Sequence, residues 1–538
     1  MEIQVEKNNE NEKEVLIHGK ENVKDEDILN FFVKRGFLLN KEVARFFREF
    51  QNRYLLEDIL NRVFTLSKTR IITKEVLINY YEDLRILFLE LEKENKEAVD
   101  SFFDNKKEDI QGVENIADDD FRASFRVLSK DVGLDKKLEI RDFVRHFKER
   151  YGFLKDLLVE KKGVANLVSM DKVAEGGDFS IVGMVVSKKI TKNKNVLIEV
   201  EDVTGRIKVL INHDREDLIA ISKEIVVDDV LVVRGSFAKE MLFAGEIFYT
   251  DSFLEERRGL EKESYCLFIS DIHLGSKNFL ESNFSKFIDW LNCKGLNEKQ
   301  KEQIKKIKYL FILGDNVDGI GVFPGQEDTL NIKNIKEQYK QLALFLDRIP
   351  KSIHVIMCPG QHDAVRVAEP QNPISEYFAK SLTKIENLHL VSNPALVEIG
   401  DKSDSNNMLK VLMYHGASMH GIINNIEDLR IKKAHLTPSK VVKYLLKKRH
   451  LAPSHGVGNI YVPAKEGDPL LIRDVPDIVA TGDLHRCDSD WYNNIQIICS
   501  GCWQSITSFE EKVGNSPDPG KVPMLNLQTR EVKILDFS

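Results

Sequence analysis

Apolar side chains near the N-terminus recur at the spacing of an amphipathic helix. The clearest run, three and four positions apart, is Val43, Phe46, Phe47 and Phe50. Asn40 precedes it, and asparagine is a residue type that caps helices. The pattern predicts a small helical interaction module over residues 21–91, preceded by a polar tail over residues 1–20 that we expect to be disordered.

The helical periodicity then weakens before it returns. Residues 92–120 are dense in Glu, Lys and Asp with little apolar repetition, which predicts a flexible acidic linker. Apolar residues again fall at helical spacing from Ile140 to Lys161. We therefore expect residues 121–164 to form a helical connector.

Between residues 165 and 255 the apolar period changes to two. Five alternating segments lie in this stretch, separated by turn sequences such as Asp202-Val-Thr-Gly205. Short antiparallel strands in this number predict an OB-like β-barrel. Such a barrel either binds a nucleic-acid strand or docks another protein. Several lysines but few aromatic residues leave both roles open.

Residues 262–538 contain short, continuously apolar runs separated by helical segments, which is typical of buried parallel strands. Five of these runs end at an Asp or a His. They lead into Asp271-Ile-His273, Gly314-Asp315, Gly360-Gln361-His362-Asp363, His415-Gly416 and Gly482-Asp483-Leu-His485. Because the carboxyl ends of parallel strands meet at one edge of a sheet, we expect these side chains to converge. The predicted fold class is an α+β multidomain chain: a helical module, an OB-like barrel and a C-terminal two-sheet α/β sandwich.

Composition places the chain among globular proteins. It has 538 residues, of which 42% are hydrophobic and 30% charged, and its six cysteines show no disulfide framework. Its net charge of −8 means that any contact with nucleic acid depends on a local basic surface. No apolar run approaches the ~18 residues of a membrane span, and the first residues lack a signal-peptide core. We expect a cytoplasmic protein without membrane contact.

The strand-end residues have the chemistry of a two-metal phosphoesterase. Carboxylates and imidazoles suit Mn²⁺, Fe²⁺ or Zn²⁺, and a carboxylate shared by two ions makes a site for phosphate-ester hydrolysis. In this interpretation Asp315 is the shared ligand. The first ion would be bound by Asp271, His273, Asp315 and His485, and the second by Asp315, Gln361, His415 and Asp483. His362 would protonate the leaving group or clamp the phosphate, with Asp318 or Asp363 orienting its ring.

The order of these motifs resembles the calcineurin-like metallophosphoesterase superfamily. The layout and several segments resemble, more particularly, the small subunits of archaeal family-D DNA polymerase. These segments are Ser270-Asp-Ile-His-Leu-Gly-Ser276, His435-Leu-Thr-Pro-Ser439, Arg449-His-Leu-Ala-Pro-Ser454 and Val475-Pro-Asp-Ile478. The resemblance implies a heterodimer with a large catalytic polymerase subunit. It also implies a proofreading 3′→5′ exonuclease that acts on single-stranded or primer-template DNA and prefers Mn²⁺, with Mg²⁺, Fe²⁺ or Zn²⁺ as alternatives.

Two positions depart from the superfamily pattern. The third motif usually reads Gly-Asn-His, and here it has Gln361; the fifth usually reads Gly-His-x-His, and here it has Asp483. Gln places its amide oxygen one methylene further out, and Asp adds negative charge, so both changes affect the second ion. Because the first-ion ligands and His362 are intact, we expect an active enzyme. The alternatives are a non-catalytic assembly subunit with a degenerate phosphoesterase domain, and a free-standing phosphatase for small esters.

A basic stretch lies between the fourth and fifth motifs. Residues 429–450 contain eight Lys and Arg residues and no acidic residue. This stretch is either the solvated face of a helix or a track for the DNA backbone beside the metal site. For the second interpretation, the candidate contacts are Lys440, Lys443, Lys447, Lys448 and Arg449.

Overall fold

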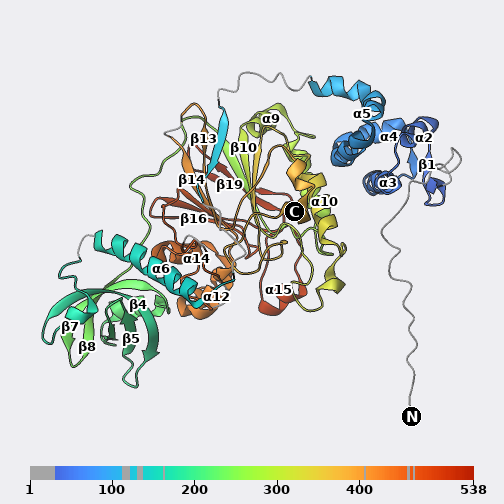
Figure 1. The fold of residues 1–538 in the computed structure, drawn as a ribbon. Coiled ribbons are helices and arrows are strands. Elements are labelled where there is room, and N and C mark those ends of the chain that lie inside the picture. The colour runs from blue at the N-terminus through green and yellow to red at the C-terminus, as the bar shows by residue number, and fades with distance from the viewer. Residues whose placement is uncertain are drawn as a thin grey trace, which may run out of the picture. The chain divides into compact units, whose positions relative to one another are not determined.

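The structure is a computed structural model, and the chain divides into two compact units, Met1–Ala117 and Asp118–Ser538 (Figure 1). The residues it describes are 31–111, 121–129, 137–160, 164–404, 407–456, 461–464 and 467–538. Within these ranges, no helix has the length and apolar character needed to cross a bilayer.

The first unit consists mainly of helices, with one short parallel strand pair. Its elements are β1 (Leu38–Leu39), α2 (Lys41–Arg48), α3 (Arg53–Ser67), β2 (Ile71–Ile72), α4 (Lys74–Asn79) and α5 (Tyr81–Gln111). The predicted helix cap is confirmed, because the side-chain oxygen of Asn40 accepts a hydrogen bond from the Val43 backbone nitrogen at 2.9 Å. Aromatic rings fill the core; Phe46 stacks on Phe102 with 4.0 Å between ring centroids.

The prediction of a linker over residues 92–120 is wrong for its first part. Helix α5 continues to Gln111, with a kink at Asn95. Val99 and Phe103 are buried in the core although this part of the chain is rich in Lys and Glu. Charged residues such as Glu94, Lys96 and Glu97 are exposed, on the outer face of an amphipathic helix. Residues 112–120, and the tail expected over residues 1–20, lie outside the described residues.

The second unit contains the predicted five-stranded barrel. Its strands are β4 (Asp178–Ile190), β5 (Val196–Glu201), β6 (Arg206–Ile211), β7 (Val230–Ala238) and β8 (Met241–Phe248). They close in the order β4-β5-β6-β8-β7, with helix α7 (Glu216–Glu224) between β6 and β7. Alternate side chains, among them Ile198, Val209 and Leu231, fill the interior. The closed barrel is confirmed, and its place in the OB-like class stays a prediction.

Two six-stranded sheets form the rest of this unit. The first sheet has the order β12 (Leu388–Leu390), β11 (His354–Cys358), β10 (Ile307–Leu313), β9 (Tyr265–Ile269), β18 (Lys521–Asn526) and β19 (Val532–Asp536). The second has the order β16 (Asp488–Tyr492), β17 (Ile495–Cys499), β15 (Ile478–Thr481), β14 (Leu409–Tyr414), β13 (Ala395–Asp401) and β3 (Ala123–Val127). Strands β9, β10 and β11 are parallel, as are β14, β15 and β17. The two sets of parallel strands end at the edge that carries the candidate site.

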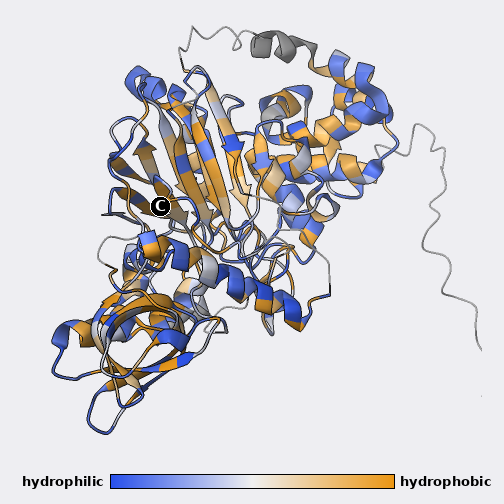
Figure 2. Cartoon of the chain, turned by 60° about the vertical axis from the view of Figure 1, so that its left-hand side comes forward, coloured by the Kyte–Doolittle hydropathy of each residue, from blue (hydrophilic) through white to orange (hydrophobic). Residues whose placement is uncertain are grey.

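Buried side chains from both sheets form one apolar cluster. Phe268 and Phe311 from the first sheet belong to the same cluster as Val411, Met413 and Ile498 from the second. Figure 2 shows hydrophobic residues concentrated along the strands. The outer faces are covered by helices, such as α10 (Ile335–Leu346) on the first sheet and α12 (Ser418–Asn425) and α14 (Ser439–Lys448) on the second. The predicted two-sheet sandwich is thus present in the structure.

The expected helical connector over residues 121–164 contains both a strand and a helix. Residues 123–127 form β3, which pairs antiparallel with β13 at the edge of the second sheet. Helix α6 (Ile140–Glu160) follows, close to its predicted range. The helix expectation is therefore wrong for β3, whose backbone finds its partner some 270 residues further along the chain. Residues 130–136 lie outside the described residues.

Helix α6 and helix α14 join the barrel to the sandwich. Leu154 and Leu158 of α6 belong to one apolar cluster with Val182 and Val232 of the barrel. Figure 1 shows α6 beside the barrel. Arg150, on the same helix, is fully buried and donates a hydrogen bond of 2.7 Å from Nε to the Asp468 carboxylate of the sandwich. The contact of α6 with the barrel is therefore apolar, and its contact with the sandwich includes a buried, charged hydrogen bond.

Candidate metal centre

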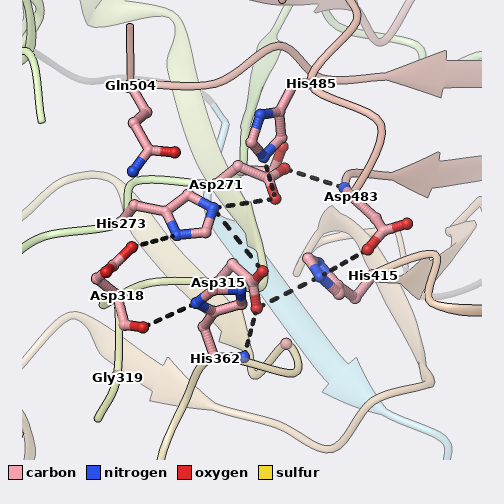
Figure 3. Close-up of polar contacts among 12 residues, drawn as sticks. Asp271, His273, Asp315, Asp318, Gly319, His362, His415, Asp483, His485 and Gln504 are labelled. Carbon is pink, nitrogen blue, oxygen red and sulfur yellow. Dashed lines mark hydrogen bonds and ion pairs between the residues drawn. The ribbon is translucent and has the colours of Figure 1, made fainter. Parts of the chain in front are cut away.

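Each predicted ligand follows the end of a strand, as the sequence pattern indicates. Asp271 and His273 follow β9, and Asp315 follows β10. His415 follows β14 directly, and Asp483 and His485 come two and four residues after β15. Figure 3 shows these side chains turned toward one another from the two sheets. The convergence at the carboxyl ends of parallel strands is thus a property of this structure.

The backbone around the site is strained in the way that functional sites often are. Five ligand candidates adopt positive φ values, from 48° to 66°. These residues are Asp271, His273, Asp315, Asp483 and His485. Sequence patterns place the ligands at strand ends but do not reveal this strain.

Glycines permit the close approach of the ligands. A Cβ on Gly360 would lie 2.2 Å from Oδ1 of Asp315, and one on Gly314 would lie 2.4 Å from Nδ1 of His415. Gly314 also has φ +93°, which side chains rarely adopt. Both glycines are therefore required for the ligands to meet.

The first ligand set surrounds one point. Nε2 of His485 lies 3.4 Å from Oδ1 of Asp271, and Nε2 of His273 lies 3.9 Å from the same oxygen. Nε2 of His273 is also 3.8 Å from Oδ2 of Asp315. Side chains of Asp271, His273 and His485 can thus hold one ion, with Asp315 at its edge.

The second ligand set shares Asp315. Its Oδ1 lies 3.4 Å from Nε2 of His415, and the same nitrogen lies 3.6 Å from Oδ1 of Asp483. Asp271, Asp315 and His415 also have ligand atoms close enough together for one ion. The two oxygens of Asp315 therefore face different imidazoles, Oδ2 toward His273 and Oδ1 toward His415, as a bridging ligand requires.

Hydrogen bonds at the far nitrogen fix each imidazole. Nδ1 of His273 lies 3.1 Å from the Asp318 carboxylate, and Nδ1 of His415 lies 2.7 Å from the backbone oxygen of Leu313. Nδ1 of His485 lies 2.8 Å from the Glu510 carboxylate. With Nδ1 as the donor, Nε2 of each ring presents its lone pair to the centre.

Unpaired buried atoms show that these residues fit divalent cations. Oδ1 of Asp271, Nε2 of His273 and Nε2 of His415 are buried and have no hydrogen-bond partner. Burial alone would lower the pKa of His415, but the carboxylates of Asp315, Asp271 and Asp483 raise it well above the usual value. The cluster therefore stabilises positive charge at its centre, and its oxygen and imidazole donors match Mn²⁺, Fe²⁺ or Zn²⁺.

His362 lies at the rim of the site, and its ring contacts one of the two residues expected to orient it. Its backbone nitrogen donates to Oδ1 of Asp315 at 2.9 Å. Nδ1 of its ring lies 2.8 Å from the backbone oxygen of Asp318, so the Asp318 carboxylate is free to bond His273 instead. Of the two residues predicted to orient the His362 ring, Asp318 therefore contacts it, through the backbone oxygen and not the carboxylate. Asp363 bonds Gly360, Asn316 and Tyr339 instead.

Asp363 has a structural position. One carboxylate oxygen accepts hydrogen bonds from the backbone nitrogens of Gly360 and Asn316, and the other accepts one from the Tyr339 hydroxyl at 2.9 Å. Burial, together with the nearby Asp315, raises the pKa of Asp363 to about 6. Asp363 thus holds the loop that carries Gln361 and His362 against β10. Its predicted catalytic role has no geometric support.

The two atypical positions differ in how they lie. Gln361 is half-buried in the loop between Gly360 and His362. The Asp483 side chain is 8% exposed and reaches His415, while its backbone nitrogen donates to Oδ2 of Asp271 at 3.0 Å. Asp483 therefore ties the second ligand set to the first.

Most of the predicted DNA track lies in internal contacts. Lys448 is buried and pairs with Asp229 of the barrel, and Arg449 is buried and bonds the backbone oxygen of Arg473. Lys443 pairs with Asp490, and Lys447 pairs with Glu224. The prediction of DNA contacts is wrong for Lys448 and Arg449, because buried cations cannot reach a phosphate backbone. For Lys440, which is half-buried, it stays a prediction.

Sequence reasoning missed three residues that support the site. Glu510 bonds His485, Tyr339 bonds Asp363, and His420 lies 3.6 Å from Asp483. For Glu510 the sequence holds a partial signal, since Thr507-Ser-Phe-Glu510 is a capping box that predicts a helix start. No local pattern indicates which distant residue this carboxylate meets.

Comparisons with known proteins agree with the geometry. The family model for the B subunits of DNA polymerases alpha and epsilon matches residues 266–489, which contain every candidate ligand. The DNA polymerase II small subunit of Pyrococcus furiosus is 35% identical over 413 residues, which cover 76% of this chain and 65% of that one. That of Methanothermobacter thermautotrophicus is 37% identical over 402 residues, which cover 74% of this chain and 80% of that one. The match thus spans slightly under two thirds of the Pyrococcus relative.

Proposed function

Because this chain belongs to the family of DNA polymerase II small subunits, the small subunits of archaeal family-D polymerase, we propose that it works in a heterodimeric replicative DNA polymerase and carries a two-metal 3′→5′ exonuclease. One observation carries the catalytic part of this proposal: the two oxygens of Asp315 face separate imidazoles of two ligand sets, at 3.4 and 3.8 Å. A site of this kind serves phosphoryl-ester hydrolysis.

Two groups of residues would each bind one divalent ion, and Mn²⁺ is the ion we consider first. Asp271, His273 and His485 would hold the first ion with Asp315. His415 and Asp483 would hold the second with Asp315. Gln361 stays a predicted ligand of the second ion. Bound ions would supply positive charge for the phosphate and acidify a water that attacks it.

His362 is the residue that we assign to the leaving group. Nδ1 is held by the Asp318 backbone oxygen, so Nε2 is the nitrogen left for substrate. In the protonated ring, Nε2–H donates to a phosphate oxygen and then gives its proton to the leaving 3′ oxygen of the shortened strand. Hydrolysis adds water across the terminal phosphodiester and releases a 5′-mononucleotide. His362 is half-buried, whereas Asp271, Asp315 and His415 are buried, so the phosphate approaches from the His362 side.

The family supports DNA as the substrate and a large polymerase subunit as the partner. The relatives are named small subunits of a DNA polymerase, and that name implies a larger catalytic partner. A proofreading site on the small subunit would receive a frayed 3′ end from the large one. The barrel and the outer faces of the sandwich offer surfaces for this assembly.

A nuclease assay tests the proposal. The purified chain, alone and with its large subunit, is incubated with 5′-labelled single-stranded DNA and Mn²⁺. We expect stepwise shortening from the 3′ end, abolished in His362→Ala and retained in His213→Ala, an exposed histidine beyond β6. Inactivity of the unmodified chain even with the large subunit would contradict the proposal and favour a non-catalytic assembly subunit. Cleavage of a chromogenic small ester without cleavage of DNA would favour a free-standing phosphatase.

A further inference from the structure

Asp483 lies between two imidazoles. Its Oδ1 is 3.6 Å from Nε2 of His415, and its Oδ2 is 3.6 Å from Nε2 of His420. Oδ2 is buried and has no hydrogen-bond partner. A buried carboxylate oxygen without a partner carries a desolvation cost, and it marks a position that a bound cation would satisfy.

His420 is placed to reach this position. It is the third residue of α12, which starts three residues after His415. This short connection brings the ring back to the edge of the site, with its Nε2 toward Asp483. The His420 side chain is 49% exposed, so it can turn by rotation about its own side-chain bonds without repacking the core.

The composition of the two ligand sets supports a role for His420. The first set has two carboxylates, Asp271 and Asp315, and two imidazoles, His273 and His485. Without His420, the second set has the two carboxylates Asp315 and Asp483 but a single imidazole. Adding His420 gives the second set the same balance of charge and donor type as the first.

Each successive contact along this set is close to the spacing of two ligands on one ion. Ligand atoms that bind one divalent ion at about 2.1 Å lie roughly 3.0–3.4 Å apart. The successive contacts from Asp315 to His415, from His415 to Asp483 and from Asp483 to His420 measure 3.4, 3.6 and 3.6 Å. Asp315, His415 and Asp483 are at most 8% exposed, so a rotation of the 49% exposed His420 side chain is the movement that would complete the set around one ion.

We propose that His420 is a ligand of the second metal ion and supplies the imidazole that position 483 lacks. This inference rests on the proposed function, since it assigns a further residue to the same two-metal site. It also accounts for Asp483: a carboxylate that stands between two histidines can share the ion with both of them.

Counting bound Mn²⁺ tests the inference without any activity measurement. The unmodified full-length chain should bind two Mn²⁺ ions by calorimetry and give the electron paramagnetic resonance spectrum of an exchange-coupled pair. In His420→Ala we expect the affinity for the second ion to fall by at least roughly 10-fold, leaving the six-line signal of one isolated Mn²⁺. Added imidazole should restore the coupled spectrum, because the exposed position gives it access. His435→Ala, a nearby histidine outside both sets, is the matched control.

The outcomes separate this inference from the proposed function. If the unmodified chain binds no Mn²⁺, the two-metal proposal itself fails. If the unmodified chain and His420→Ala bind two ions with the same affinities and the same coupled spectrum, the role of His420 is refuted while the two-metal site stands. Loss of both ions in a folded His420→Ala protein, judged by circular dichroism, would also contradict a role at the second ion alone.

Discussion

The Glu510 carboxylate lies 2.8 Å from Nδ1 of His485, a metal-ligand candidate 25 residues earlier in the chain. The other oxygen of the same carboxylate accepts hydrogen bonds from the backbone nitrogen and the hydroxyl of Thr507, at 2.8 and 2.9 Å. The bond from the Thr507 backbone nitrogen, together with one from the Glu510 backbone nitrogen to the Thr507 hydroxyl, forms the capping box of helix α15 (Ser508–Val513). The start of a short helix thus fixes the carboxylate that orients an imidazole of the site.

This relationship predicts a metal-binding defect in Glu510→Ala. Losing the hydrogen bond frees the His485 ring and lowers the basicity of Nε2, so the affinity for the first Mn²⁺ should fall by roughly 10- to 100-fold. Glu510→Gln keeps the capping box and a hydrogen-bond acceptor, so it should lose less. Calorimetric titration measures both, with Glu511→Ala, an exposed neighbour, as the control. An unchanged affinity in Glu510→Ala would show that the His485 ring needs no support.

Asp315→Asn should remove the stabilisation that Mn²⁺ gives to the fold. Asp315 faces both ligand sets, so a neutral amide in its place weakens both ions. An ion that binds only the folded chain stabilises it by about 2.7 kcal/mol at a free concentration 100 times its Kd. Thermal unfolding should therefore shift upward with Mn²⁺ in the unmodified chain and in the exposed control Asp328→Asn. A full Mn²⁺ shift in Asp315→Asn would exclude it as the shared ligand.

The sequence could predict the ligands because each of them follows a strand end at short range. An apolar run that stops at Asp or His is visible in the chain itself, and the parallel order of β9, β10 and β11 then brings such ends together. The partners of the ligands are not predictable in this way. Asp318 bonds His273 from 45 residues away, and nothing local distinguishes that contact from one with His362. Such long-range hydrogen bonds depend on how the loops pack in the folded sandwich.

The two errors in the predicted secondary structure, at α5 and β3, have different physical causes. Helix α5 carries a buried set, Val99, Phe102 and Phe103, at helical spacing among its charged residues. The helical pattern is thus present in the sequence, but the charged composition of this stretch led to the prediction of a linker. Strand β3 has no continuous apolar run and is half-exposed. It forms a strand because it pairs with the edge of β13. This tertiary pairing overrides the secondary structure that the local sequence favours.

The buried pair of Lys448 and Asp229 predicts a large stability effect at the contact between α14 and the barrel. Both side chains are at most 2% exposed, and burial lowers the pKa of Lys448 to about 8 although Asp229 is its partner. Asp229→Ala leaves the lysine buried and uncompensated, so it should destabilise the fold by roughly 3–5 kcal/mol in chemical denaturation. Lys447→Ala breaks the neighbouring, partly exposed pair with Glu224 and should cost within about 1 kcal/mol. Equal effects of the two changes would contradict this account.

Acid should weaken the polar anchor between α6 and the sandwich. Burial, with Arg150 close by, lowers the pKa of His450 to about 4 despite the Asp468 carboxylate; His146 also has a pKa of about 4, chiefly through burial. Because the unfolded chain takes up these protons near pH 6.5 and the folded chain near pH 4, the stabilisation is complete above pH 6.5 and declines as the pH falls toward 4. For His450 the loss between pH 7 and pH 5 is on the order of 2 kcal/mol.

The measurement for this pH effect is urea denaturation with EDTA at both pH values. His450→Gln lacks the titrating group, so the difference in stability between it and the unmodified chain should shrink at pH 5. His213→Gln, in which the replaced ring is half-exposed, should follow the unmodified chain at both pH values. A stability difference for His450→Gln that does not change with pH would show that His450 has the same pKa in the folded and the unfolded chain.

Gly360→Ala should disable the site while the protein stays folded. The new Cβ would lie 2.2 Å from Oδ1 of Asp315 and 2.8 Å from Nε2 of His415, the two atoms that begin the second ligand set. Relief of this overlap must push the shared carboxylate away from the imidazole, so we expect loss of the second Mn²⁺ in calorimetry and loss of exonuclease activity. Gly152→Ala is the control: nothing lies within 4 Å of its Cβ, and alanine in helix α6 should stabilise the fold by about 0.5–1 kcal/mol. Two ions bound with normal affinity in Gly360→Ala would mean that Asp315 and His415 need not approach each other as closely as they do here.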